Sequence, residues 1–336
     1  MIIDAHSHWL PEGIINNAHF YHKGWGDIEA QVKMMDEAGI DRAVLSYPTS
    51  DAHLKMGSIS EVVRIFNDHV GKIIRKYPDR FIGAAILPVD HQPDILKEIK
   101  RATEELGFKA ISLATSFGGI YLDDARFLGV YKIAQSQNLP IFVHSQIVKP
   151  IGSERVEDPL LTPVIEYVFD TTMCIGKLLM SDILRDYKVK FIFGYFGGVT
   201  PFLANRFDAT YEMLRGINFV KDLKAKPTEY LKNIYVDTSG DKTQSNFSAA
   251  LELLGPKHIL WGSDWPAKKD IVSGIQAVRD LDISNEDKNN ILGGNLAQIL
   301  ALYNFSVCLV LFLAGTHDFP LRGKSCSATR LRSRWF

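Results

Sequence analysis

The sequence contains little cysteine: three residues in a chain of 336, none of them in a C-x-x-C pair. This scarcity excludes a disulfide-stabilised scaffold and is typical of proteins from a reducing compartment, so we expect a cytoplasmic protein. The N-terminus also lacks a basic segment followed by an apolar stretch, which argues against a signal peptide.

The chain has almost no net charge. Its 38 Lys and Arg residues oppose 39 Asp and Glu residues, a formal charge of −1, and no basic stripe interrupts this balance. The sequence therefore offers no electrostatic basis for binding nucleic acid. A long apolar run is missing as well: residues 305–315 form a stretch shorter than the roughly 20 residues that span a bilayer, so membrane association is not expected.

Short apolar segments instead alternate with amphipathic helical segments such as 59–77, 93–106 and 125–137. Eight strands are predicted, at residues 2–4, 42–46, 81–87, 110–113, 141–144, 190–194, 234–237 and 259–262. Regular alternation implies parallel strands joined by right-handed crossovers, and eight such units predict an α/β fold of the closed (β/α)₈ TIM-barrel type. A doubly wound open sheet is the alternative, but the phosphate-binding glycine pattern is missing after the first strand.

The composition changes abruptly near residue 304. We expect residues 1–304 to form the catalytic barrel and residues 305–336 to form an atypical tail, first apolar and then basic. A packed extra helix or strand and an end without function remain equally open for this tail. A membrane tail anchor is the least favoured interpretation.

The first predicted strand leads into Asp4-Ala-His6-Ser-His8. In an extended chain, residues two apart point to the same side, so His6 and His8 can offer two imidazole nitrogens to one metal ion. A borderline-soft divalent cation such as zinc prefers these ligands. A chance H-x-H pair in a loop is the alternative.

Polar residues follow other predicted strands at the same end. His144 closes the fifth strand, Tyr195 follows the sixth, and Asp264 follows the eighth. Active sites of (β/α)₈ barrels lie at the carboxyl ends of the strands, so we expect these side chains to meet His6 and His8 on one rim. Asp237, which closes the seventh strand, either supports this site by a hydrogen bond or simply ends its strand.

Six motifs then identify a family resemblance, which extends from residue 1 to about residue 303. They are DAHSHWLP at 4–11, YPDRF at 77–81, ELGF at 105–108, LPIFVH at 139–144, FGG at 196–198 and WGSDWP at 261–266. Together they resemble the amidohydrolase superfamily, in the amidohydrolase-related (amidohydrolase 2) branch that includes aminocarboxymuconate-semialdehyde decarboxylase and the resorcylate-type decarboxylases.

The resemblance implies a metal-dependent enzyme acting on a small carboxylic acid. It implies that one divalent ion, zinc with manganese as the alternative, is bound by His6, His8, His144 and Asp264, with one coordination position open. It also implies a homodimer in which Arg206 crosses the subunit interface and holds the substrate carboxylate. An ordinary helix arginine in a surface ion pair is the alternative for Arg206. Trp9 and Trp265 are the remaining candidates for substrate contact.

Tyr195 departs from the family pattern, which has histidine at this position as an acid or base. Tyrosine has an ordinary pKa of about 10 and is a poor base at neutral pH, although it can still donate a hydrogen bond or a proton. Hydrolysis, which must activate water, suffers more from this change than decarboxylation does. We therefore expect a carboxy-lyase with Asp264 and Tyr195 as catalytic groups. A hydrolase of a lactone, amide or C–C bond and a catalytically silent ligand-binding barrel are the alternatives.

Overall fold

The computed structural model describes residues 1–16, 21–47, 58–89, 92–147, 149–151, 158 and 160–302. The chain divides into a body, Met1–Leu300, and a second unit, Ala301–Phe336, of which only the first two residues are among those described. The expectations for the tail at 305–336 therefore fall outside the described residues.

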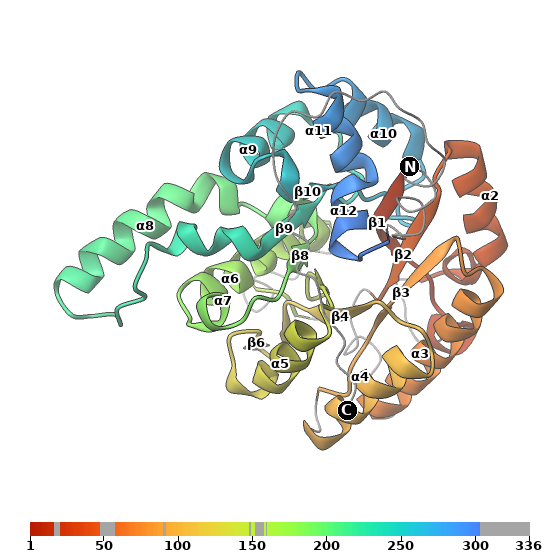
Figure 1. Ribbon diagram of the computed structural model, residues 1–336, viewed down its shortest axis with the longest axis horizontal. Coiled ribbons are helices and arrows are strands. Elements are labelled where there is room, and N and C mark those ends of the chain that lie inside the picture. Colours follow the sequence, from red (N-terminus) through yellow and green to blue (C-terminus); the bar gives the residue numbers. More distant parts are fainter. Residues whose placement is uncertain are drawn as a thin grey trace, which may run out of the picture. The chain divides into compact units, whose positions relative to one another are not determined.

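The body is built on one sheet of eight parallel strands (Figure 1). In spatial order they are β1 (Ile3–His8), β2 (Arg42–Ser46), β3 (Phe81–Ala85), β4 (Ala110–Ala114), β7 (Ile141–His144), β8 (Phe191–Phe193), β9 (Ile234–Asp237) and β10 (Ile259–Leu260). The sheet closes where β1 meets the segment after β10, because the Ala5 amide donates to the Trp261 carbonyl at 2.9 Å and the His8 amide to the Trp265 carbonyl at 2.8 Å. The predicted (β/α)₈ barrel is confirmed.

Helices cover the outside of this sheet (Figure 1). They are α1 (Glu12–Ile15), α2 (Ile28–Ala38), α3 (Ile59–Lys76), α4 (Gln92–Glu104), α5 (Leu128–Ser136), α6 (Tyr167–Leu179), α7 (Ile183–Asp186), α8 (Thr200–Gly216), α9 (Gln244–Leu254), α10 (Ile271–Arg279), α11 (Asn285–Asn289) and α12 (Asn295–Ile299). Short 3₁₀ segments are η1 (Lys23–Gly26), η3 (Ala125–Phe127), η5 (Tyr195–Gly197), η6 (Pro227–Asn233) and η7 (Pro256–His258), and π-helical turns are η4 (Thr162–Glu166) and η8 (Asn290–Gly294). The predicted helix at 59–77 begins at a Ser58–Glu61 capping box, which satisfies exposed amides of its first turn.

Two strand boundaries differ from the predicted ones in a way that matters for the site. β1 continues to His8, so both histidines lie within the strand, where pairing with Ser46 and the bridge between Ser7 and Trp265 hold it extended. β10 ends at Leu260, and Asp264 lies in the irregular segment that follows. A small hairpin of β5 (Ser116–Phe117) and β6 (Ile120–Tyr121) was not predicted.

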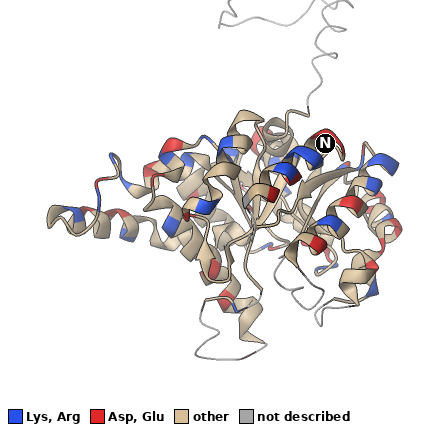
Figure 2. Ribbon diagram, turned by 90° about the horizontal axis from the view of Figure 1, so that it is seen from below, with Lys and Arg blue, Asp and Glu red and all other residues tan. Residues whose placement is uncertain are grey.

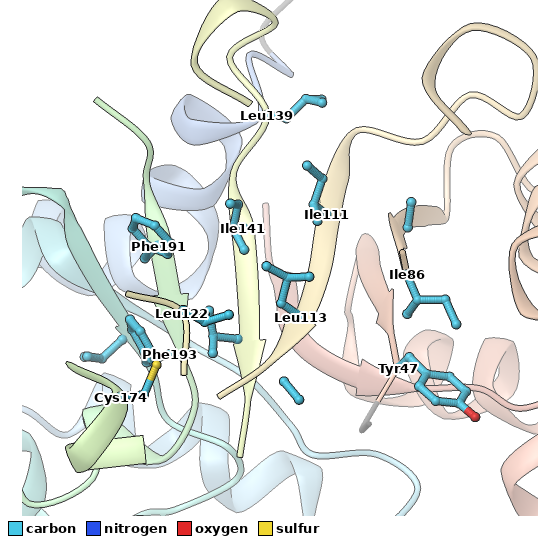
Figure 3. Packing of buried hydrophobic residues seen from close by; sticks show 14 of the residues in the cluster. Tyr47, Ile86, Ile111, Leu113, Leu122, Leu139, Ile141, Cys174, Phe191 and Phe193 are labelled. Carbon is cyan, nitrogen blue, oxygen red and sulfur yellow. The ribbon is translucent and has the colours of Figure 1, made fainter. Parts of the chain in front are cut away.

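A packed apolar core supports the barrel rim. Ile141 on β7 lies between Ile111 on β4 and Phe191 on β8, and Cys174 on α6 packs beside Phe193 (Figure 3). These side chains are buried, and each large one contributes roughly 1.5–3 kcal/mol by leaving water. The strands that carry the polar side chains at their ends are consequently held in place by this packed core.

Charges of both signs are interspersed over the described helices (Figure 2). This distribution agrees with the near-zero net charge of the whole chain. Within the described part of the chain, no helix combines the length and the apolar character needed to cross a membrane.

Candidate metal centre at the barrel rim

Three histidines converge at the carboxyl ends of β1 and β7. His6, His8 and His144 are all buried, and one ring nitrogen from each lies within 4.8 Å of the others. His6 and His8 reach the same point because they are two residues apart on one strand. His144 reaches it as the last residue of β7.

Each of these rings has an acceptor behind its Nδ1 atom. His6 Nδ1 donates to the Asp237 carboxylate at 2.9 Å, His8 Nδ1 to the Ser46 carbonyl at 3.1 Å, and His144 Nδ1 to the Ser145 carbonyl at 2.7 Å. A hydrogen bond at Nδ1 fixes the tautomer and leaves Nε2 with a lone pair, as metal-ligating histidines require. Asp237 is thus a supporting residue of the site, which settles the alternative that the sequence left open.

Asp264 completes the cluster from the segment after β10. Its Oδ1 atom lies 3.8 Å from His6 Nε2 and 3.6 Å from His8 Nε2. The backbone there is left-handed, with φ of 60°, and the Asp264 amide donates to the His6 carbonyl at 2.8 Å. A non-glycine residue held in this strained region is characteristic of functional sites.

The electrostatics of the cluster also suit a cation. Burial, reinforced by the neighbouring His8 and His6, lowers the pKa of His144 to about 3, so this ring is neutral. Burial opposes the charged form of His6, but the charge and hydrogen bond of Asp237 outweigh it and raise the pKa of His6 to about 9, so without a metal this ring is protonated and a bound cation would take the place of its Nε2 proton. Burial likewise opposes ionisation of Asp264, yet the nearby histidines and Lys268 hold the pKa of its carboxyl below the ordinary value.

The surroundings of the His6 Nε2 atom indicate whether a metal fits this cluster. It is buried and has no hydrogen-bond partner within the described ranges. Leaving such an atom unpaired costs free energy, and buried polar atoms normally have partners. A cation bound by three imidazoles and one carboxylate supplies the missing partner, so the residues present fit a divalent metal.

Tyr195 lies at the edge of the same cluster. Its hydroxyl points at Asp264 Oδ2 from 3.5 Å, the outer limit of a hydrogen bond, and its ring centre is 6.1 Å from that of His6. Tyr195 has φ of 53°, and its amide donates to Ser239 Oγ at 2.9 Å. Burial, then the charge of Asp264, raises the pKa of Tyr195 well above its ordinary value, so the hydroxyl stays protonated at neutral pH.

A glycine makes this turn possible. Gly198 has φ of 69°, and a β-carbon there would collide with the Val168 carbonyl oxygen and the Thr172 hydroxyl of α6. Only glycine combines that backbone conformation with so close an approach. The FGG motif thus shapes the turn that carries Tyr195.

The three residues predicted to contact substrate lie at different distances from the histidine cluster: Trp265 is next to Asp264 in the chain, whereas Arg206 lines a separate groove. Trp265 is adjacent to Asp264 in a half-buried position, its peptide to Pro266 is cis, and Lys269 Nζ lies 4.0 Å from its ring centre. Trp9 donates its indole hydrogen to the Gly26 carbonyl at 2.9 Å and packs against His69. Arg206 is exposed on α8 and lines a groove against α6 that contains none of the metal-site residues.

Two site residues were missed by the sequence reasoning. The Trp25 ring, from η1, stacks on the His8 ring with 5.7 Å between centres, although nothing in its local pattern pointed to the site. Ser239 donates from Oγ to Asp237 Oδ1 at 2.6 Å and accepts from the Tyr195 amide. It follows β9 by two residues, so the rule that polar residues gather at strand ends was enough to find it.

A family model and two curated relatives match most of this chain. The family model described as amidohydrolase matches residues 3–302. A 2-amino-3-carboxymuconate-6-semialdehyde decarboxylase of Dictyostelium discoideum is 24% identical over 82% of this chain and 77% of its own length. A gamma-resorcylate decarboxylase of a Polaromonas species is 28% identical over 82% of this chain and 87% of its own length.

Solved structures resemble the fold. The 5-carboxyvanillate decarboxylase of Sphingomonas paucimobilis superposes with a TM-score of 0.78 at 19% identity, covering 89% of this chain and 98% of that one. A dihydroxybenzoic acid decarboxylase from Polaromonas, solved with manganese and the inhibitor 2-nitroresorcinol, gives a TM-score of 0.77 at 23% identity, covering 90% and 97%.

Proposed function

The chain belongs to the amidohydrolase family, and from this premise we propose that it is a metal-dependent decarboxylase of a small aromatic or unsaturated carboxylic acid. The observation that carries the proposal is the pairing of an intact His₃Asp cluster with Tyr195 in place of a neutral-pH base. The two curated relatives described above, both decarboxylases, support the same reaction class.

We propose that His6, His8, His144 and Asp264 hold one divalent ion. When bound, such an ion supplies a Lewis acid that binds and polarises an oxygen of the substrate. The imidazole-rich ligand set favours zinc, and the manganese found in the Polaromonas structure makes manganese the second ion to test.

Tyr195 and Asp264 supply the proton chemistry in this proposal. Decarboxylation converts an acid anion and a proton into CO₂ and a new C–H bond, so a donor must face the carbon that loses the carboxylate. The Tyr195 hydroxyl, which its raised pKa keeps protonated, is the donor: its O–H bond breaks as the new C–H bond forms, and a proton from water restores the hydroxyl before the next turnover. The Asp264 carboxylate, 3.5 Å away, orients that hydroxyl. A hydrolase would need a base that deprotonates water, a role for which a protonated tyrosine is unsuited.

We also propose that the enzyme is a homodimer. Ten of the thirteen large hydrophobic side chains that are exposed among the described residues lie between Leu160 and Phe219, on or beside α6 and α8. A groove of about 480 Å³ runs between these helices, and Arg206 stands on its wall. Exposed apolar side chains gathered in one region are typical of a protein interface, and an arginine there can hold a carboxylate in the partner subunit.

The low cysteine content supports the cytoplasm as the compartment of this enzyme.

The reaction is tested by incubating the metal-loaded protein with a panel of hydroxylated benzoic acids and unsaturated dicarboxylic acids. We expect release of CO₂ matched by equal amounts of the decarboxylated product. A parallel panel of lactones and activated amides measures hydrolysis. Hydrolysis without any CO₂ release would replace the lyase with the hydrolase, and inactivity on both panels together with failure to take up metal would favour a silent barrel.

A further inference from the structure

We propose that Asp170, acting through Thr115, is a positioning residue for the metal ligand His144. The inference rests on the proposed metal centre and deepens it. Asp170 lies on α6, is 1% exposed and touches none of the four ligands directly. Its carboxylate instead holds in place the backbone that the His144 ring depends on.

Asp170 is the acceptor of a dense set of hydrogen bonds. The Thr115 hydroxyl donates to its Oδ2 atom, and the Tyr121 hydroxyl donates to Oδ1 at 2.8 Å. The amides of Gln146 and Ile151 donate at 3.4 and 3.3 Å. The donors come from the end of β4, the small hairpin and the loop after β7, so one buried carboxylate joins the segments around His144.

Thr115 connects the Asp170 carboxylate to the backbone beside His144 by hydrogen bonds. Its amide donates to the His144 carbonyl at 2.8 Å, and its hydroxyl oxygen accepts from the Gln146 amide at 2.9 Å. A hydroxyl has one hydrogen, and a carboxylate can only accept. Because that hydrogen goes to Asp170, the lone pair of Thr115 must face Gln146.

The relay reaches the imidazole through a single peptide unit. The Gln146 amide and the Ser145 carbonyl belong to the same plane and point in opposite directions. Holding the amide toward Thr115 therefore holds the carbonyl toward His144, whose Nδ1 donates to it at 2.7 Å. The same hydrogen bond orients the ring and leaves Nε2 for the metal.

Metal affinity measures this chain of contacts without any substrate. Groups that orient a ligating histidine typically change metal affinity by about 10-fold to 100-fold when they are removed. We expect Thr115→Val, which keeps the shape but removes the hydroxyl, and Asp170→Asn to raise the dissociation constant by such a factor. Competition with a chelator gives the constant, and the visible spectrum of the Co²⁺-loaded protein reports the ligand geometry. Thr115→Ser keeps the relay and should bind like the native protein.

Tyr121→Phe is the matched control. It removes one hydrogen bond from Asp170 on the side that does not reach the Ser145–Gln146 peptide. It should lower the unfolding temperature while leaving the dissociation constant and the Co²⁺ spectrum unchanged. A Thr115→Val protein that folds and binds metal as tightly as the native chain would overturn the proposal, as would an equal loss of affinity in Tyr121→Phe. Native protein that takes up no metal would instead overturn the proposed function itself.

Discussion

At the scale of single residues, the candidate site depends on groups that arrive from separate parts of the chain. His6 and His8 come from β1, His144 from β7 and Asp264 from the strained segment after β10. The core beneath them is apolar and packed independently of any ion. Losing a ligand should therefore harm metal binding far more than folding.

His6→Ala and Asp264→Ala test the ligand assignment. We expect both variants to keep the native circular dichroism spectrum and to lose most of their bound metal when measured by elemental analysis, because each removes one of four donors. Asp241→Ala changes a nearby carboxylate that caps the turn before α9 and should keep its metal. Near-full occupancy in both ligand variants would show that the ion binds elsewhere.

Tyr195 provides the second prediction at this scale. Tyr195→Phe removes the hydroxyl that faces Asp264 and should lower turnover by about 10²-fold to 10⁴-fold, the size of a general acid–base contribution. The metal content should not change, because tyrosine is not among the ligands. Tyr195→His introduces a base and should raise hydrolysis of activated esters or lactones. Native turnover in Tyr195→Phe would mean that the ring only fills space.

Sequence reasoning brought together the residues of the candidate cluster but not most of their hydrogen-bond partners. His6, His8, His144, Asp264 and Tyr195 were predictable because they follow apolar strands whose ends must share a rim. Of the three Nδ1 partners, Asp237 was one of two alternatives that the sequence left open, whereas the Ser46 and Ser145 carbonyls were not predicted because the side-chain pattern does not reveal the direction of a backbone group. Trp25 reaches His8 from an irregular loop, which carries no periodic pattern.

At the scale of elements, α6 performs two tasks. Its inner face carries Asp170 and Cys174 into the core, and its outer face presents Phe169 and Met173, 49% and 41% exposed, to the groove beside α8. Figure 1 shows α8 extending outward from the ring of helices that surrounds the sheet. The amphipathic division of α6 thus links the barrel to the proposed subunit interface.

Charge placed on this outer face should break the dimer. We expect Phe169→Glu and Met173→Glu to shift the mass measured by sedimentation or light scattering from dimer to monomer, because burying an unpaired carboxylate in an apolar contact is costly. Val272→Glu alters an exposed apolar residue on α10, away from the groove, and should leave the mass unchanged. A monomeric native protein, or variants that remain dimers, would refute this interface.

Subunit mixing tests whether Arg206 serves the partner's site. Arg206→Ala and Asp264→Ala should each be inactive, and mixing them should restore part of the native rate, because some mixed dimers contain one intact site. Mixing each variant with itself is the control. Failure to recover activity in a preparation shown to exchange subunits would assign Arg206 to its own subunit or to the surface.

Secondary-structure prediction succeeded for strands that form a compact apolar run and failed for strands of only two residues. The strands at 42–46, 141–144 and 234–237 were predicted to the residue, since each is a compact apolar run. The hairpin of β5 and β6 was missed, although Gly118 and Gly119, with φ of 56° and 79°, form the two-residue turn that such hairpins favour. β1 was predicted too short, because its polar end is held extended by neighbours distant in sequence.

At the scale of the whole molecule, the residues that stabilise the barrel differ from those that form the candidate site. Apolar residues of the strands and the surrounding helices pack into one core, while the polar groups gather at one rim. The fold could be predicted because strand–helix alternation constrains it strongly. The substrate could not, since the residues around a pocket vary independently of the barrel.

Metal-dependent decarboxylation is tested most directly by titrating metal back into the metal-free protein during the reaction. Metal is removed with a chelator, retention of the fold is checked by circular dichroism, and Zn²⁺ or Mn²⁺ is returned in steps while CO₂ release from an accepted aromatic acid is measured. We predict no release without metal, a linear rise that stops at one ion per chain, and no rise for Asp264→Ala. Undiminished CO₂ release by the metal-free protein would show that the decarboxylation does not depend on a metal ion.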